Sequence, residues 1–207
     1  MKQPQLLSLL RQALLSALTA VTLGGCAAVV VGGAAVTAMV VTDRRTSGTQ
    51  LEDQNIETKV ATRTREIMGD RGHINAVSYS RTVLLTGEVD TEADRSAIEQ
   101  AVARIENVRS TVNELAVMAS TSMSARSSDA VLTSKVKASY VDAKDLQVNS
   151  IKVVTERTVV YLMGRVTERE ATRAAELARG VSGVQKVVRV FEILTEAELS
   201  ALGGSKS

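Results

Sequence analysis

Hydrophobic and polar positions along the chain fall into two similar series of segments. In each series, apolar residues first recur near helical spacing, then fill two strand-like runs, and then return to a helical face and an alternating strand. The segments of the first series are residues 52–68, 74–79, 82–89, 91–104 and 108–117. Those of the second series are residues 130–142, 148–155, 158–166, 168–179 and 184–193. The pattern predicts the order helix, strand, strand, helix, strand twice.

The central strands of the two series have related sequences. The first has VLLTGEV at residues 83–89, and the second has VYLMGRV at residues 160–166, 77 positions later. Each contains one glycine, Gly87 or Gly164, and glycine inside a strand often marks a bulge or the close approach of another backbone. We therefore expect structural roles for both glycines.

The helix after each central strand has a recognisable start. Thr91 and Thr167 stand at the expected N-caps, and an acidic residue, Asp94 or Glu170, follows three positions later. A threonine hydroxyl at this position can accept a hydrogen bond from a free backbone N–H of the first turn. The second pair also fits the capping box, in which the acid bonds back to the cap residue.

The first 25 residues have the three parts of a secretory signal peptide. Lys2 and Arg11 supply positive charge, residues 13–23 are apolar, and two glycines precede the chain's single cysteine, Cys26. The quartet LGGC that ends at Cys26 resembles the bacterial lipobox, which implies cleavage and attachment of a diacylglycerol and an N-acyl chain to the cysteine. Acyl chains anchor a protein because each buried methylene adds about 0.8 kcal/mol. We expect no other cofactor.

The residue after the cysteine bears on location. In bacterial lipoproteins of this type an aspartate there usually implies retention in the inner membrane. Ala27 therefore implies a lipid-anchored protein of the outer membrane that faces the periplasm. The alternative is an uncut helix spanning residues 13–41, since residues 27–41 are also apolar.

The net charge argues against nucleic acid as a partner. The full chain carries 25 Lys and Arg against 23 Asp and Glu, a formal charge of +2. Lys2 and Arg11 leave with the signal peptide, so the mature chain has 23 of each and is not strongly cationic. Aromatic residues make up only 2% of the chain, which leaves few rings for base stacking.

The two series of segments differ in charge. Residues 53–118 hold eight basic and eleven acidic side chains, a net −3, whereas residues 129–194 hold eleven basic and eight acidic ones, a net +3. Each cation close to an anionic membrane surface adds about 1 kcal/mol to binding. The asymmetry favours the second unit as the part that faces anionic phospholipid.

These observations divide the chain into six parts. They are a lipoprotein signal peptide at 1–25, a lipidated apolar and flexible tether at 26–52, a first domain at 53–118, a linker at 119–128, a second domain at 129–194 and a C-terminal tail at 195–207. Residues 195–202 could add a short final helix.

The repeated unit resembles the BON domain. Each copy has the motif V-x-L-x-G-x-V, a capped helix, and then Asn-Val or Gly-Val before an alternating strand. The lipobox, the phrase DRRTSGTQ at residues 43–50 and two such units together resemble the dual-BON outer-membrane lipoproteins. The resemblance implies an α+β fold with two tandem BON domains, each αββαβ with a small three-stranded mixed sheet packed against two helices.

The family also implies phospholipid contact through the first helix of the second unit, which here is residues 129–142. Within this helix, Leu132, Val136 and Tyr140 fall on one face and are expected to pack inward. Val131 matches the position of a membrane-inserting aromatic in the family, but it offers less apolar area and no interfacial ring. The candidate phospholipid-binding residues are Val131, Lys135, Lys137 and Ala138.

The sequence therefore predicts a non-enzymatic outer-membrane lipoprotein that binds anionic phospholipid through its second BON domain and supports outer-membrane integrity. The alternative is a lipid-anchored periplasmic adaptor whose acidic first domain binds outer-membrane assembly, cell-division or peptidoglycan proteins. Catalysis has little support, because the chain has one histidine, His73, and no thiol besides Cys26. His73 is expected in a loop, and no zinc-ligand spacing exists, so no metal site is expected.

Overall fold

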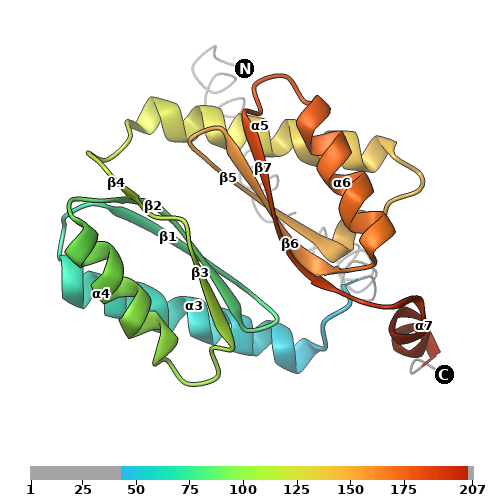
Figure 1. Cartoon of the computed structure of the whole chain (residues 1–207), viewed down its shortest axis with the longest axis horizontal. Helices are drawn as coiled ribbons and strands as arrows, with labels where there is room; N and C mark the ends of the chain where they lie inside the picture. Colours follow the sequence, from blue (N-terminus) through green and yellow to red (C-terminus); the bar gives the residue numbers. More distant parts are fainter. Residues whose placement is uncertain (1–42, 205–207) are drawn as a thin grey trace, which may run out of the picture. The chain divides into compact units, whose positions relative to one another are not determined.

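The computed structural model describes residues 43–204, so the predictions for the signal peptide, for Cys26 and for tether residues 26–42 lie outside the described residues. The first domain contains α3 (Ser47–Met68), β1 (His73–Tyr79), β2 (Thr82–Val89), α4 (Glu92–Ala103), β3 (Ser110–Asn113) and β4 (Ala116–Val117) (Figure 1). The second contains α5 (Met123–Asp142), a 3-10 turn (Val148–Ser150), β5 (Ile151–Glu156), β6 (Val159–Val166), α6 (Glu168–Gly180) and β7 (Lys186–Ile193). A last helix, α7 (Glu196–Gly204), follows.

Each domain has a mixed sheet with the same topology. β1 pairs antiparallel with β2, and β3 then joins β2 in parallel. In the second domain β5, β6 and β7 repeat this arrangement. Parallel neighbours need a crossover connection, which α4 and α6 supply. The predicted α+β class and the αββαβ order are confirmed.

The last strand of the first sheet is interrupted, whereas one strand was expected over residues 108–117. The Asn113 side chain turns back, and its Oδ1 accepts a hydrogen bond from the Leu115 backbone N–H at 3.2 Å. An asparagine that satisfies a backbone N–H in this way competes with the sheet ladder. Pairing with β2 resumes at β4, which is also parallel.

Each domain buries a core between its sheet and its two helices (Figure 1). In the first domain Ile56 and Val60 of α3 and Ile98 of α4 lie with strand residues in one buried cluster. The equivalent cluster of the second domain includes Val136, Tyr140, Val160, Leu162, Ala171, Ala174 and Ala178. The expected inward face of α5 is confirmed, since its Leu132, Val136 and Tyr140 are all buried.

The two sheets also pack against each other through their remaining faces. A third buried cluster joins Tyr79 and Leu84 of the first domain to Val154, Tyr161 and Met163 of the second. The central strands, β2 and β6, are therefore buried on both faces, by helices on one face and by the other sheet on the second. This explains why VLLTGEV and VYLMGRV are nearly continuous apolar runs rather than alternating ones.

A two-residue turn joins β1 to β2 in a strained conformation. Ser80 and Arg81 both have positive φ, 49° and 64°, as a type I′ hairpin turn requires. The buried carboxylate of Asp53 in α3 accepts hydrogen bonds from both backbone N–H groups, at 2.8 and 2.7 Å. These bonds offset the cost of left-handed backbone at residues other than glycine.

The second domain repeats this device with different residues. Arg157 and Thr158 have φ of 49° and 61°. Asp129 of α5 accepts from their backbone N–H groups at 2.8 and 2.9 Å. The aspartate that opens each unit therefore fixes the hairpin turn of that unit.

Several segments expected to be irregular are ordered. α3 begins at Ser47, inside the predicted flexible tether, with Thr46 as its N-cap. α5 begins at Met123, inside the predicted linker 119–128, with Ser122 as its N-cap. A segment rich in serine and threonine is typical of a linker, but here these residues supply the hydroxyl groups that cap helices. In the predicted tail, α7 matches the short final helix considered for residues 195–202.

His73, which was expected in a loop, is the first residue of β1. Its partner in the strand register is Glu88 of β2. Its side chain is partly buried, at 26% exposure, because a strand position opposite a paired neighbour is more enclosed than a loop.

Candidate membrane-contacting surface

Helix α5 presents one face to the core and the opposite face to solvent. On the exposed face lie three large apolar side chains, Met123, Val131 and Val141, which are 72%, 56% and 70% exposed. Helical spacing places them on one side of the helix, over a length of about 27 Å at 1.5 Å per residue. We call this exposed row, with the small residues between its apolar members, the α5 stripe: Met123, Ser127, Val131, Ser134, Ala138 and Val141.

Two lysines border the α5 stripe. Lys135 and Lys137 are both exposed, and at about 100° per residue they lie on opposite sides of the stripe. Within residues 43–204 the lysines that form ion pairs are Lys59 and Lys152, so both ammonium groups beside the stripe lack an acidic partner. The structure thus brings together all four candidate residues of the sequence analysis on one exposed face.

Two large apolar residues of the α5 stripe, Met123 and Val141, were not among the candidates predicted from the sequence. Met123 lay in the predicted linker, and Val141 lay at the end of the predicted helix. The signal that identifies them is their spacing of 18 residues, which is five helical turns, once the helix is known to begin at Met123.

The positive charge of the second domain is only partly available to a membrane. Lys152 forms an ion pair with Glu57 of the first domain at 3.1 Å, and Arg157 reaches Glu88 at 3.0 Å. These pairs join the basic domain to the acidic one. The net charge of a whole domain therefore overstates what can face lipid, and the relevant cations are those beside the α5 stripe.

The two strand glycines lie where another backbone comes close. A Cβ on Gly87 would overlap the carbonyl oxygen of His73, and a Cβ on Gly164 would overlap that of Ser150. Gly87 also has a φ of 111°, a conformation that disfavours other residues. Neither glycine takes part in the exposed face of α5.

The two threonines cap their helices through their hydroxyl oxygens. Thr91 accepts from the Asp94 backbone N–H at 3.0 Å, and Thr167 accepts from that of Glu170 at 3.3 Å. Glu170 Oε2 in turn accepts from the Thr167 backbone N–H at 2.9 Å, which completes the capping box.

Residues 43–45, expected to belong to a flexible tether, contact both domains. The Arg44 guanidinium binds both carboxylate oxygens of Glu170 in the second domain, at 2.7 and 2.8 Å, and these bonds lower the pKa of Glu170. The Arg45 guanidinium pairs with Asp53 of the first domain at 2.9 Å and lies 4.1 Å above the Tyr79 ring. Two charged residues that find buried partners are the reason this segment is ordered.

Burial in this region also affects Tyr79. Its ring lies in the cluster between the two sheets, and burial raises the pKa of its hydroxyl to about 12. Tyr79 therefore stays neutral at physiological pH and serves as a packing residue.

No helix within residues 43–204 combines the length and the apolar composition needed to cross a bilayer.

Comparison with known proteins covers both domains. The model of the BON domain matches residues 52–119 and again residues 128–195. The chain is 38% identical over 163 residues to the outer membrane lipoprotein DolP of Haemophilus influenzae, covering 77% of this chain and 84% of that protein. It is 31% identical over 151 residues to a 21 kDa hemolysin of Actinobacillus pleuropneumoniae, covering 72% and 78%.

A solved structure of CdsD, a structural protein of the type III secretion system of Chlamydia trachomatis, aligns with 70% of this chain and 97% of that one. Its identity is 10% and the TM-score is 0.29, values too low to carry an argument about this chain.

Proposed function

The chain belongs to the BON-domain family, and from this premise we propose that it is a non-enzymatic outer-membrane lipoprotein whose α5 stripe binds anionic phospholipid and thereby supports outer-membrane integrity. The similarity to a protein named outer membrane lipoprotein DolP supports this location. The LGGC sequence that ends at Cys26 supports a lipid anchor facing the periplasm.

The observation that carries the proposal is the composition of the exposed face of α5. Met123, Val131 and Val141 expose apolar area in one row, and Lys135 and Lys137 border that row without acidic partners. A helix of this kind lies in the plane of the membrane interface, with apolar side chains in the acyl boundary and cations at the headgroups. Each lysine near an anionic surface adds about 1 kcal/mol.

The face is small, so we expect α5 alone to bind weakly. It has no tryptophan or tyrosine to sit at the headgroup level, where aromatic side chains favour membrane interfaces. Acyl chains on Cys26 would supply most of the retention, and α5 would orient the second domain on the lipid surface.

Vesicle sedimentation of the mature chain carrying Cys26→Ser, which cannot be acylated, tests the proposal. We expect binding to vesicles with anionic phospholipid and little binding to neutral ones. Lys135→Glu combined with Lys137→Glu should reduce the binding constant about tenfold or more, because two positive charges beside the lipid surface become negative.

The matched control is Arg104→Glu with Lys186→Glu, which makes the same change of charge at exposed positions outside α5. Equal losses in the two double variants, or equal binding to neutral and anionic vesicles, would contradict the proposal. Crosslinking in intact envelopes addresses the adaptor alternative: a dominant protein crosslink through the first domain that survives the α5 reversals would favour it.

A further inference from the structure

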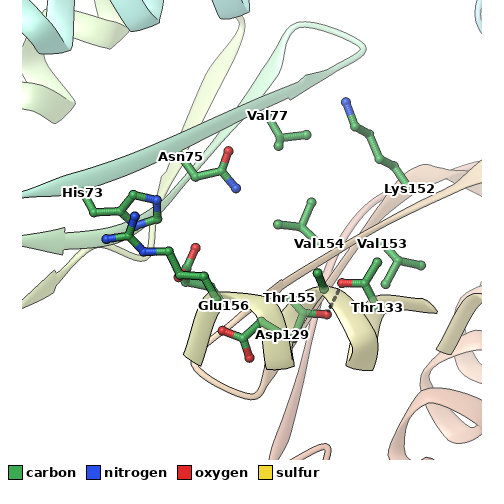
Figure 2. A pocket seen from close by; sticks show the side chains of 12 residues that line it. His73, Asn75, Val77, Asp129, Thr133, Lys152, Val153, Val154, Thr155 and Glu156 are labelled. Atoms are coloured by element: carbon green, nitrogen blue, oxygen red, sulfur yellow. Dashed lines mark hydrogen bonds between the residues drawn. The ribbon is translucent and has the colours of Figure 1, made fainter. Parts of the chain in front are cut away.

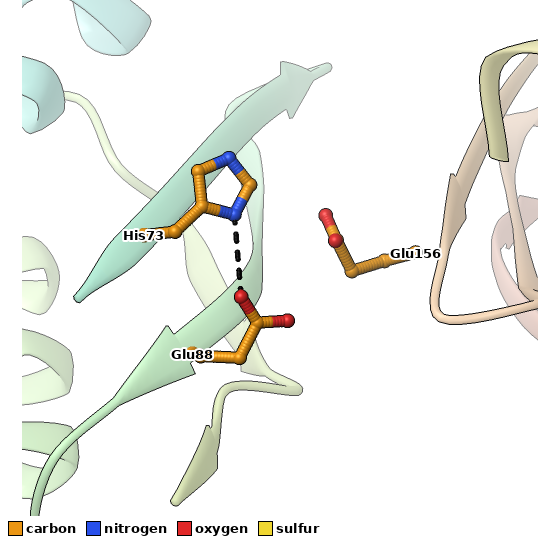
Figure 3. Close-up of side chains that lie close together, drawn as sticks. All are labelled: His73, Glu88 and Glu156. Atoms are coloured by element: carbon orange, nitrogen blue, oxygen red, sulfur yellow. Dashed lines mark ion pairs between the residues drawn. The ribbon is translucent and has the colours of Figure 1, made fainter. Parts of the chain in front are cut away.

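A cluster of three potential metal ligands lies where the two domains meet. His73 begins β1 and Glu88 lies opposite it on β2, so their side chains share one face of the first sheet. Glu156 ends β5 of the second sheet and points toward them (Figure 3). The three residues lie far apart in the sequence and form no metal-binding motif, so their spacing along the chain does not reveal the cluster.

The donor atoms are close to one another. The His73 nitrogen, one carboxylate oxygen of Glu88 and one of Glu156 all lie within 4.8 Å of each other. His73 Nδ1 is 3.5 Å from Glu88 Oε2. Two ligands bound to one tetrahedral Zn²⁺ at about 2.0 Å are separated by about 3.3 Å, so the donor atoms would move together by up to about 1.5 Å to bind one ion.

His73 Nδ1 lacks a partner of its own. This nitrogen is buried and has no hydrogen bond among the described residues, although Glu88 Oε2 lies 3.5 Å away. A buried ring nitrogen without a partner is rare in folded proteins. A metal ion between the ring and the carboxylates would satisfy it.

Glu156 lacks a cation. Its residue is only 4% exposed, and its hydrogen-bond partner is the Thr86 hydroxyl at a long 3.4 Å. No ion pair of Glu156 exists within residues 43–204, since the guanidinium of the adjacent Arg157 pairs with Glu88 instead. A buried carboxylate without a counter-charge is costly, so the site favours a cation.

The neighbouring charged residues do not supply the counter-charge that Glu156 lacks. Arg157 binds Glu88 Oε1 at 3.0 Å, while Thr121 donates to Glu88 Oε2 through its backbone N–H at 3.1 Å. Asp129 adds a further negative charge near Glu156, and Arg126 lies on the wall of the adjacent cavity. Lys152, on the same wall, is paired with Glu57 at 3.1 Å, so the two arginines face the three remaining carboxylates, Glu88, Asp129 and Glu156.

A cavity gives access to the cluster. It has a volume of about 460 Å³, and its wall includes His73, Asp129, Lys152 and Glu156 (Figure 2). The cavity lies between β1 of the first domain and α5 and β5 of the second. It has room for an ion to enter and for a water molecule to complete the coordination.

From these observations we propose that His73, Glu88 and Glu156 bind one divalent transition-metal ion, best matched by Zn²⁺, that joins the two domains. One imidazole and two carboxylates suit Zn²⁺ and its first-row neighbours, whereas Mg²⁺ and Ca²⁺ prefer oxygen ligands alone. Three protein ligands leave a fourth position for water from the cavity. Because the ligands come from both domains, binding favours the packed arrangement over separated domains.

Zinc titration of the metal-free mature chain tests the site. The protein carries Cys26→Ser so that no thiol competes, and ZnCl₂ is added in competition with a chromophoric chelator. We expect one equivalent to bind and the melting temperature to rise. His73→Gln and Glu156→Gln should each weaken binding at least tenfold and abolish the rise, and Co²⁺ should give a visible absorption band that both variants lose.

Glu57→Gln is the matched control, since Glu57 is another acid between the domains and pairs with Lys152 away from the cluster. It should bind zinc as the parent does. Circular dichroism without metal shows whether each variant is folded. Absence of stoichiometric binding to the parent, or unchanged affinity in both folded ligand variants, would overturn the proposal.

Discussion

At the scale of single residues, two aspartates determine the geometry of the hairpins. Asp53 of α3 and Asp129 of α5 occupy equivalent positions, and each satisfies both N–H groups of a left-handed turn. Neither turn contains glycine, so local sequence alone would not favour its conformation. The two carboxylates, distant in sequence, stabilise by hydrogen bonding a turn conformation that a glycine within the turn would favour.

Asp129→Ala should lower the free energy of unfolding by about 2 to 4 kcal/mol. The substitution leaves two turn N–H groups without their acceptor, at about 1 to 3 kcal/mol each if they stay buried. Urea unfolding followed by circular dichroism measures the change. Asp142→Ala, an exposed acid in the same helix, is the control and should change stability by less than about 0.5 kcal/mol. An equal effect of the two substitutions would refute the role assigned to Asp129.

The threonine caps, unlike the two aspartates, could be predicted from the sequence. Thr167 and Glu170 form a capping box that their spacing of three residues already indicates. In the sequence the two aspartates are recognisable only as a repeated residue type, because the turn residues that they bind lie 27 to 29 positions away. Contacts within one turn are encoded locally, whereas contacts between a helix and a distant hairpin depend on the fold.

At the scale of secondary-structure elements, α5 combines two roles. One face fills the core of the second domain, and the other exposes the α5 stripe. The helix is 20 residues long, longer than the sequence predicted, because a serine-rich segment supplies its N-cap and first turns. Its extra length is what aligns Met123 with Val131 and Val141.

Val131→Trp should strengthen vesicle binding of the chain carrying Cys26→Ser about three- to tenfold. An indole at the centre of the α5 stripe adds apolar area and a ring suited to the headgroup level. Sedimentation with anionic vesicles measures the effect. Thr58→Trp places the same ring at an exposed position of α3 and should leave binding unchanged. If both substitutions strengthen binding alike, general hydrophobicity rather than the α5 stripe is responsible.

At the scale of the described molecule, the two domains are joined by packing and by charge. The faces of the sheets that do not contact helices share one buried cluster, and ion pairs surround it. Residues 43–45 add a third connection, because Arg44 and Arg45 bind different domains. The two repeats therefore form one compact unit, although each has its own core.

Arg44→Ala should lower the free energy of unfolding by about 1.5 to 3 kcal/mol at pH 7, since charged hydrogen bonds in a mostly buried pair are lost. Arg44 lowers the pKa of folded Glu170, so its contribution is fully present above the ordinary glutamate pKa of about 4.3. It is lost as pH falls through the lowered value. The deficit of the variant should therefore shrink on acidification.

Urea unfolding at pH 7 and at successively lower pH measures this dependence. Arg63→Ala removes an exposed pair with Glu66 and should cost less than about 1 kcal/mol at pH 7. A deficit of Arg44→Ala that stays constant down to pH 3 would contradict the assigned role of Glu170.

The sequence by itself determined the repeat, the order of elements, the helix caps and the BON family, because these depend on periodicity and on contacts within a few residues. It also placed Val131, Lys135 and Ala138 on one helix face, with Lys137 beyond them. Only the tertiary structure decided that the sheets pack together, that part of the opposite charges is used between the domains, and that His73 meets Glu88 and Glu156. Those contacts join segments up to 95 residues apart, and pairing across such distances is set by three-dimensional packing rather than by local pattern.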